Sequence, residues 1–191
     1  TNDPYLIYDV YGLQGMFTGL SNSYKLNNDI EATSTRLWDT IFYGYGFRPV
    51  GNNTTPFSGV FDGAGHSINN LYINAFSNGI AVTSYIGLFG YSTNLIKDVT
   101  LNNLSITATS SSGSNGSSYG DGVDGVSTSN GIAGFAGNAG SVLYLGGLVG
   151  YNTGNISNVN ISGSVSGTAG SGGRGSRGGH GGNISSGSNT A

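Results

Sequence analysis

The feature that most restricts the fold of this chain is a motif that occurs three times along it. The segment from Ile86 to Thr107, IGLFGYSTNLIKDVTLNNLSIT, is one copy. Each copy contains a glycine, two apolar residues, a polar turn and an isoleucine, with apolar residues three and five positions after that isoleucine. A step of 28 residues separates the first two copies, and a step of 60 separates the last two. The positions predicted to be equivalent are Gly59, Phe61, Ile68, Leu71 and Ile73; Gly87, Phe89, Ile96, Val99 and Leu101; and Gly147, Val149, Ile156, Val159 and Ile161.

The repeated unit is predicted to form short β-strands separated by turns. Its apolar residues mix a spacing of three with a spacing of two, whereas an amphipathic helix keeps a period of about 3.6 residues. Glycine and asparagine interrupt the pattern every few residues, which favours turns. Units that recur and cannot bury an apolar face alone must stack on their neighbours. The sequence therefore predicts an all-β fold, a parallel β-solenoid whose equivalent residues lie about 4.8 Å apart.

A polar turn residue recurs at one place in each copy. Asn70, Asp98 and Asn158 occupy this place. Asn and Asp favour turns because their side chains bond to nearby backbone groups. We expect each of them to bond to the backbone of its own coil or the next one, so Asp98 is predicted to be structural rather than catalytic.

The segments outside the repeats differ in character. Tyr5 to Tyr11 is typical of a strand, and the apolar spacing from Leu13 to Leu20 suits one short helix. An aromatic patch around Trp38 is predicted to cover the end of the core, with a carbohydrate-stacking platform as the alternative. The predicted organisation is an N-terminal capping region at 1–50, two coils at 51–107, a Gly/Ser-rich insertion at 108–145, a third coil at 146–169, and a Gly-rich tail that starts a further coil at 170–191.

Glycine occurs at every third residue in two runs, Gly131 to Gly140 and Gly172 to Gly181. Three residues per turn is the period of an extended polyproline-II helix, in which glycine permits close contact between chains. Collagen is excluded, because the chain has only three prolines. A flexible linker is the alternative interpretation. The insertion and the tail are both predicted to leave the same corner of the coil.

The composition excludes several classes of protein. Only 8% of the residues are charged, and six Lys and Arg with a net charge of -3 provide no basic face for nucleic acid. The absence of cysteine excludes a disulfide framework and a thiolate metal site. Because no apolar run approaches the ~18 residues that span a bilayer, no membrane insertion is expected. Since the chain begins at Thr1, we expect a processed protein or a segment of a longer one.

The order of the motifs resembles that of bacterial surface proteins with GLUG repeats. The matching residues are Asn28-Asp29-Ile30, Trp38, Pro49-Val50-Gly51, Phe57 to Ile73, Gly87-Leu88-Phe89-Gly90 and Gly147-Leu148-Val149-Gly150. The resemblance spans roughly residues 24 to 165. It implies a right-handed β-helix, secretion, and an adhesive or surface-structural role without a shared catalytic site. The Gly-rich insertions depart from the family pattern, so features particular to this protein are expected there.

Few residues are candidates for chemistry. Parallel β-helices also carry polysaccharide lyases and hydrolases, which use paired carboxylates. No two acids fall at equivalent positions of adjacent coils, so no catalytic pair is predicted. Asp121 and Asp124 are candidates for a calcium site, with a solvated loop as the favoured alternative. No cofactor is expected.

Three functional hypotheses remain open. The first is a non-catalytic, secreted cell-surface β-solenoid that acts in adhesion or as a structural fibre segment. Its expected partners are the remainder of a longer surface protein, surface glycans or other cells. The second is a subunit of an extracellular filament joined head to tail by strand pairing. Its predicted assembly strand contains Tyr5, Leu6, Ile7, Tyr8 and Val10. The third is a polysaccharide-processing β-helix enzyme.

Overall fold

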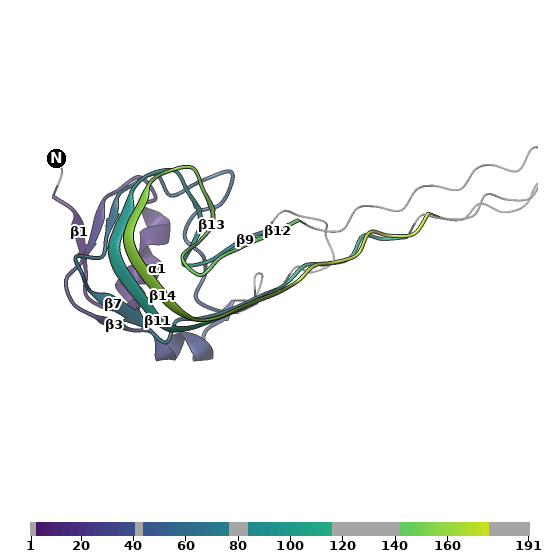
Figure 1. The fold of residues 1–191 in the computed structure, drawn as a ribbon, viewed down its shortest axis with the longest axis horizontal. Coiled ribbons are helices and arrows are strands. Elements are labelled where there is room, and N and C mark those ends of the chain that lie inside the picture. Colours follow the sequence, from purple (N-terminus) through teal and green to yellow (C-terminus); the bar gives the residue numbers. More distant parts are fainter. Residues whose placement is uncertain (1–2, 41–43, 77–83, 116–141, 176–191) are drawn as a thin grey trace, which may run out of the picture.

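The computed structural model describes residues 3–40, 44–76, 84–115 and 142–175, and most of its regular elements are β-strands (Figure 1). Within these residues there is one α-helix, α1 (Val10–Gly15), and two 3-10 helices, η1 (Met16–Thr18) and η2 (Thr33–Leu37). The strands are β1 (Tyr5–Ile7), β2 (Tyr24–Leu26), β3 (Ile30–Glu31), β4 (Asp39–Thr40), β5 (Gly44–Gly46), β6 (Phe61–Asp62), β7 (Ser67–Asn69), β8 (Tyr72–Phe76), β9 (Ser84–Ile86), β10 (Phe89–Ser92), β11 (Ile96–Thr109), β12 (Leu143–Leu145), β13 (Val149–Asn152) and β14 (Ile156–Thr168).

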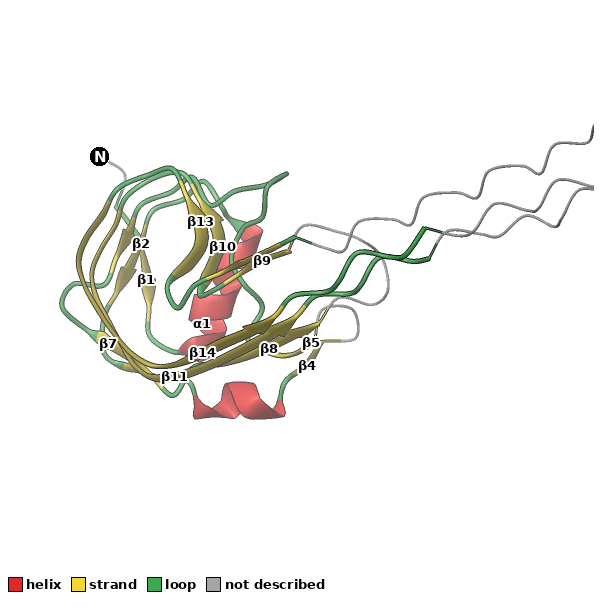
Figure 2. Ribbon diagram, turned by 45° about the vertical axis from the view of Figure 1, so that its right-hand side comes forward, coloured by secondary structure: helices red, strands yellow, loops and turns green. Residues whose placement is uncertain are grey.

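The long strand β11 is the centre of a parallel sheet that curls around the core (Figure 2). One edge of β11 pairs with β6, β7 and β8 in turn, and its other edge pairs with β14. β1 pairs with β2, β2 with β6, and β3 with β7, all in parallel. The antiparallel pair of β4 and β5 joins β8, while β10 with β13 and β9 with β12 form two separate parallel pairs. The fold is therefore mostly β and built on a curled parallel sheet.

Residues in the left-handed conformation bend the long strands around the core. In β11, Asp98 and Asn103 have φ angles of 53° and 52°, and in β14 Asn158 has a φ of 50°. Asn and Asp adopt this conformation more readily than other non-glycine residues. The polar turn residues that interrupt the apolar pattern therefore bend β11 while its apolar residues stay on the inside. The buried apolar residues of β11 are Ile96, Val99, Leu101, Leu104, Ile106 and Ala108.

The predicted step of 60 residues is confirmed: Ile96 pairs with Ile156, Val99 with Val159, and Leu101 with Ile161. The predicted step of 28 is wrong. The partners of β11 in the preceding coil show this, because Ile96 pairs with Phe61, Leu101 with Ile68, and Ile106 with Ile73. The counterpart of Phe89 is Val50. Gly59 follows Phe57, whose bridge partner is Ser92, so Gly59 is not the equivalent of Gly87.

Loops of unequal length in the first coil explain the wrong step. Between Val50 and Phe57 the chain makes a turn around Asn52, whereas their counterparts in β10 are joined without a loop. Between β6 and β7 a second turn, with positive φ at Ala64 and Gly65, takes more residues than β11 needs for the same bend. Two copies aligned at a constant step cannot reveal such loops, because the apolar pattern is short enough to match in a shifted register.

The N-terminal strand is shorter than predicted. β1 ends at Ile7, and the side chain of Asp9 caps α1 by accepting a 2.7 Å hydrogen bond from Gly12 N–H. Because Asp is a favoured N-cap residue, it starts the helix. Tyr8 therefore lies in a link and Val10 is buried in α1, so neither belongs to the predicted assembly strand. The helix predicted from Leu13 to Leu20 is realised as α1 and η1, which end at Thr18.

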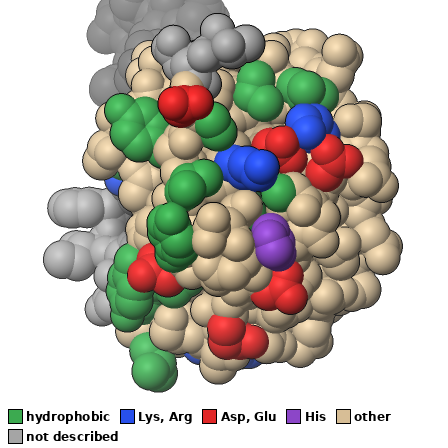
Figure 3. All heavy atoms as spheres, turned by 90° about the vertical axis from the view of Figure 1, so that its left-hand side faces the viewer, with side chains coloured by type: hydrophobic (Ala, Val, Ile, Leu, Met, Phe, Trp, Pro, Cys, Tyr) green, Lys and Arg blue, Asp and Glu red, His purple; other side chains and the backbone are tan. Residues whose placement is uncertain are grey.

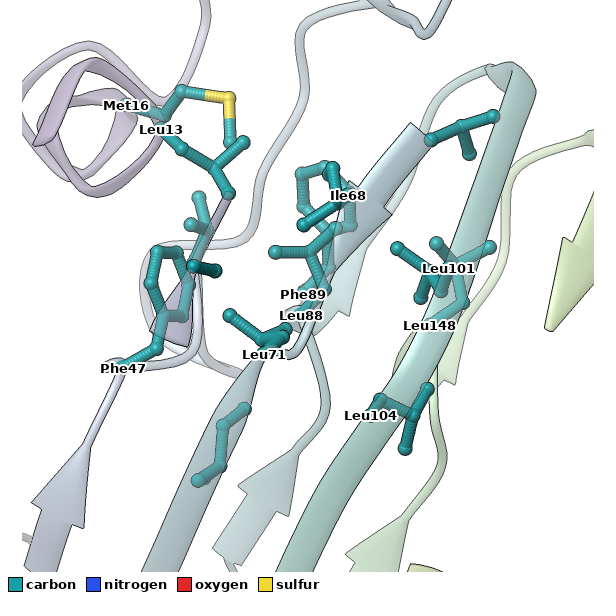
Figure 4. Close-up of a cluster of buried hydrophobic side chains, with 14 of the residues drawn as sticks. Leu13, Met16, Phe47, Ile68, Leu71, Leu88, Phe89, Leu101, Leu104 and Leu148 are labelled. Atoms are coloured by element: carbon teal, nitrogen blue, oxygen red, sulfur yellow. The ribbon is translucent and has the colours of Figure 1, made fainter. Parts of the chain in front are cut away.

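The core joins the N-terminal cap to the coils. Side chains of α1 and η1 lie over apolar residues of the sheet (Figure 4). Phe57 and Phe61 pack against Phe89, with ring centroids 4.9 and 5.2 Å apart. Trp38, at the centre of the predicted aromatic lid, packs on the core and stacks on Phe47 at 6.3 Å. The largest fully buried side chains are Phe47, Phe57, Phe61, Phe89, Leu13, Met16, Leu26, Ile30, Ile68, Leu71, Ile73 and Leu88.

In the last coil, the apolar side chains of β14 are partly exposed to solvent. Ile156, Ile161 and Val165 of β14 are 44%, 45% and 43% exposed, although their partners in β11 are at most 1% exposed. Within the described residues, no strand pairs with the second edge of β14. β14 therefore presents an apolar rung that the described part of the chain leaves uncovered.

Beyond Thr109 and Thr168 the two strands continue side by side as an extended arm (Figure 1). We call residues 110–115 and 169–175 the arm. The prediction that the insertion and the tail leave the same corner is thereby confirmed. The run Gly131 to Gly140 lies outside the described residues, as does the second run after Gly175.

Candidate functional site

A cluster of polar side chains around Lys97 connects β6, β11 and β14 on the outer surface of the sheet. Lys97 Nζ lies 2.8 Å from a carboxylate oxygen of Asp62 on β6 and 2.8 Å from one of Asp98. Asn158 of β14 donates its side-chain amide to the other Asp98 oxygen at 2.7 Å. Asp62 and then Asp98 raise the pKa of Lys97, while Lys97 and then Asn158 lower the pKa of Asp98. These four side chains form a ladder that joins successive coils.

A second polar ladder starts at Glu31 on β3. Glu31 accepts a 2.9 Å hydrogen bond from the side-chain amide of Asn70, and Asn103 donates to Asn70 Oδ1 at 2.7 Å. The Thr33 hydroxyl, followed by Asn70, lowers the pKa of Glu31. Asn70 therefore stacks with Asn103, whereas the sequence predicted that it stacks with Asp98. The predicted turn conformation is confirmed, but these ladder bonds join side chain to side chain rather than side chain to backbone.

Asp29 forms a smaller cluster beside this ladder. Its Oδ1 accepts a 2.8 Å hydrogen bond from Ser67 N–H and lies 3.3 Å from His66 Nδ1. The Ser67 backbone bond is the main cause of the lowered Asp29 pKa. Figure 3 shows acidic, basic and histidine side chains gathered on one face of the body. Each of these clusters connects neighbouring strands through polar side chains.

No two acids were predicted at equivalent positions of adjacent coils, and Asp62 indeed pairs in register with Lys97 rather than with Asp98. Asp62 and Asp98 come together at Lys97, because the true register places Asp62 beside Lys97. Their arrangement is nevertheless that of an ion-pair cluster. A glycosidase acid needs a raised pKa, whereas the pKa of Asp98 is lowered.

Four tyrosines form a cluster that the sequence reasoning missed. Tyr85 and Tyr144 pair across β9 and β12 and stack with centroids 5.0 Å apart and planes 5° apart. Tyr91 and Tyr151 pair across β10 and β13 with centroids 4.9 Å apart, and the two pairs meet edge to face. Burial, followed by the neighbouring Tyr144, raises the pKa of Tyr85. The signal was present in the sequence, because a tyrosine flanks each Gly-Leu-x-Gly segment on both sides.

A groove of about 500 Å³ lies beside α1. Tyr11 packs on Trp38 at 5.4 Å, and the Arg48 guanidinium lies 3.8 Å from the centre of the Phe17 ring. The Gln14 side chain fixes the Arg48 backbone by accepting from its N–H at 2.8 Å and donating to its carbonyl at 3.0 Å. The groove is thus a largely apolar surface with three aromatic rings at the N-terminal cap. It is lined by Tyr11, Gln14, Gly15, Phe17, Thr18, Trp38 and Arg48.

Asp121 and Asp124, the calcium candidates, lie outside the described residues. Within the described ranges, no group of three or more His, Cys, Asp or Glu side chains is placed to hold a metal ion. Likewise, none of the described helices is long and apolar enough to cross a membrane.

Comparison with known proteins gives a partial match to one very large protein. Over 121 residues, 58% of this chain, the sequence is 35% identical to halomucin of Haloquadratum walsbyi, and the chain spans 1% of halomucin's length. No family model matches the chain. The crystal structure of a protein from Bacteroides ovatus, provisionally described as an immunoglobulin A1 protease, aligns with 84% of this chain and 38% of its own. That alignment has a TM-score of 0.47 and 18% sequence identity.

Proposed function

We propose that this chain is a non-catalytic segment of a secreted, cell-surface protein, built as a right-handed parallel β-solenoid, and that it acts in adhesion or as a structural spacer. The polar ladders carry this proposal. Asp62, Lys97, Asp98 and Asn158 bond to one another across coils, and Glu31 begins a second such series. Side chains that would be available for catalysis on an enzyme surface here connect one coil to the next.

The comparison with halomucin supports a location at the cell surface. The proposal includes three further features. The curled sheet closes into a solenoid, the solenoid is right-handed, and the chain is related to GLUG-repeat proteins. Because the match covers 1% of halomucin, we infer that the coils form one part of a longer surface protein.

The groove beside α1 is the place where we expect an adhesive contact with a glycan. Sugars combine apolar ring faces with hydroxyl groups, and the groove combines the Tyr11, Phe17 and Trp38 rings with Gln14 and Arg48. Tyr11 is 66% exposed and thus accessible to a ligand. Tyr8 is 57% exposed but does not line the groove, which makes it a matched control.

The experiment is a panel of neutral and acidic polysaccharides on which binding and turnover are measured in parallel. We expect binding of at least one glycan without product, weakened by Tyr11→Ala and unchanged by Tyr8→Ala. Equal losses in the two variants would exclude the groove as the contact. A product formed by the wild-type chain and lost in Asp62→Asn would overturn the non-catalytic role and favour a polysaccharide-processing enzyme.

A second candidate function is a filament subunit, favoured by the two ends of the stack. β14 presents the exposed Ile156, Ile161 and Val165 at one end, while β1 is the outermost strand at the other, with Tyr5 63% and Leu6 47% exposed. Pairing of β14 with β1 of another copy would be a heterologous contact, which builds a filament when the rotation between copies does not close a ring. Electron microscopy at increasing concentration tests this candidate. Filaments that disappear in Ile161→Asp would support it, and uniform single particles at every concentration would contradict it.

A further inference from the structure

The four clustered tyrosines form two pairs that cross from one coil to the next. Tyr85 and Tyr144 occupy paired positions of β9 and β12, and Tyr91 and Tyr151 occupy paired positions of β10 and β13. The ring centroids within the two pairs lie 5.0 and 4.9 Å apart, with interplanar angles of 5° and 37°. Because residues at paired positions of neighbouring strands point to the same face, the two rings of each pair leave the backbone in the same direction.

Glycines bring the two pairs close to each other. A Cβ added to Gly90 would lie 2.9 Å from the carbonyl oxygen of Tyr85, and one added to Gly150 would lie 2.9 Å from that of Tyr144. Since glycine has no Cβ, β10 can approach β9 in one coil, and β13 can approach β12 in the next. The distances among the four rings therefore follow from backbone packing as well as from ring stacking.

The rings remain accessible from solvent although they stack on one another. Tyr144 and Tyr151 are 37% and 38% exposed, and Tyr85 and Tyr91 are half-buried. A small oxidant or the edge of an electron-accepting protein can therefore reach at least one phenol of each pair, and a released phenolic proton can pass to water.

We propose that Tyr85 with Tyr144, and Tyr91 with Tyr151, are sites of oxidative cross-linking, at which a haem peroxidase and hydrogen peroxide convert each pair to dityrosine. Each phenol gives up one electron and one proton, and the two phenoxyl radicals form a C–C bond between the ring carbons next to their oxygens. The hydrogen on each of these carbons then moves to the oxygen, which restores both phenols. The two electrons and two protons removed from a pair reduce one hydrogen peroxide to two waters.

Each cross-link joins positions that are far apart in the sequence. Tyr91 and Tyr151 are 60 positions apart. A covalent bond that closes so long a loop restricts the unfolded chain, as a disulfide does. The chain has no cysteine, so coupled tyrosines give it a covalent connection between coils that a disulfide cannot supply. This modification does not depend on the adhesive or structural role proposed above, because it takes place within one chain.

A third tyrosine pair provides an internal comparison. Tyr5 and Tyr24 also occupy paired positions, on β1 and β2, but their ring centroids lie 5.8 Å apart. Tyr24 is only 7% exposed, and its hydroxyl donates to the carbonyl of Gly19 at 3.0 Å. Its ring is held in the core by packing and by this bond, so it cannot turn toward Tyr5. Pairing of two tyrosines across strands is therefore not sufficient, and this pair should not couple.

The test treats the full chain, at a concentration where it is monomeric, with a haem peroxidase and hydrogen peroxide. We expect a monomeric product that has lost two hydrogens per cross-link, and peptide mapping by mass spectrometry should recover both cross-linked pairs. Tyr91→Phe keeps the ring but cannot form a phenoxyl radical, so it should lose the cross-link to Tyr151 and retain that between Tyr85 and Tyr144. The double variant Tyr85→Phe/Tyr91→Phe should lose both. Tyr5→Phe is the matched control and should retain both.

A second readout is the stability of the treated protein. Cross-linked wild-type protein should unfold at a higher urea concentration than untreated protein, because its unfolded chain is restricted. Treatment should leave the urea midpoint of Tyr85→Phe/Tyr91→Phe unchanged. Circular dichroism of the untreated proteins should show the same fold for the wild type and all variants.

Four outcomes would overturn the proposal. The first is a wild-type chain without dityrosine after treatment, and the second is dityrosine found only in covalent dimers. The third is an intramolecular yield that is unchanged in the double phenylalanine variant. The fourth is coupling within one coil of the wild type, from Tyr85 to Tyr91 or from Tyr144 to Tyr151, which would leave the coils unconnected.

Discussion

β11 and β14 pair in parallel with one register shift, between Leu101 and Leu104, yet their apolar side chains have different environments. Ile96, Leu101 and Ile106 in β11 are at most 1% exposed, whereas their partners in β14 are between 43% and 45% exposed. Both strands also share a bend at the first polar turn, at Asp98 and Asn158. Backbone geometry is thus set by the residue in each strand, while burial is set by the position of the strand in the stack. Mutations that separate these two contributions test this conclusion.

The largest expected effect is the difference between equivalent truncations in the two strands. Leu101→Ala removes a fully buried side chain and should lower the free energy of unfolding by about 2–5 kcal/mol. Ile161→Ala, at the paired position, should cost less than about 1.5 kcal/mol because the side chain is already half in water. Urea unfolding followed by circular dichroism measures both. Similar losses at low protein concentration would mean that another segment covers β14.

The next effect concerns the backbone of β14, where packing matters little. Gly163 has a φ of 138°, and an added Cβ would lie 2.2 Å from Leu104 O of β11. Gly163→Ala should therefore cost about 1–3 kcal/mol in spite of the exposed location. Gly65→Ala is the control, since Gly65 has a φ of 81° but no atom within 4 Å of its Cβ position. If the two variants lose equal stability in urea, the clash with β11 contributes nothing.

The sequence predicts the part of this fold that repeats without loops. The step from β11 to β14 could be identified because Ile96, Val99 and Leu101 recur in the same spacing at Ile156, Val159 and Ile161. The step from the first coil to β11 could not be identified in this way. The extra turns at Asn52 and Ala64 shift the register, but a short apolar triplet still matches at the wrong step. The strand predicted at Tyr5 to Tyr11 was too long. The prediction followed the β-propensity of these residues and did not take Asp9 as the N-cap residue that starts α1.

The candidate sites were less predictable than the strands, because they depend on register. The Lys97 ladder requires knowing that Asp62 lies beside Lys97, and the wrong step placed Asn69 there instead. The groove beside α1 brings Tyr11, Phe17 and Arg48 together across the cap, and no spacing rule connects those positions. The tyrosine cluster was within reach, since Tyr91 and Tyr151 are related by the correct step of 60.

A smaller effect is expected from the turn residue that β11 and β14 share. Asp98 has a φ of 53°, and its side chain, 32% exposed, bonds to Lys97 and Asn158. Asp98→Asn should leave the free energy of unfolding at pH 7 nearly unchanged, because Asn tolerates this conformation and the ion pair is near the surface. Asp98→Ala should lower it more than Asp98→Asn does, because alanine tolerates this conformation less well and cannot bond to Asn158. Equal values for the two variants in urea unfolding would mean that the turn conformation is unimportant.

The smallest effect is the acid sensitivity of the ladders. The pKa of Asp98 is lowered, first by Lys97 and then by Asn158, and the pKa of Asp29 is lowered first by Ser67 N–H. A carboxyl whose folded pKa lies below its unfolded value stabilises the fold above the unfolded pKa of about 4, and this stabilisation is lost as the pH falls through the folded pKa. The melting temperature should therefore be steady from pH 7 to about pH 5 and fall below about pH 4. Asp98→Asn lacks one of these carboxyls and should show a shallower fall, whereas identical acid profiles would mean that the ladder at Lys97 contributes no pH-dependent stability.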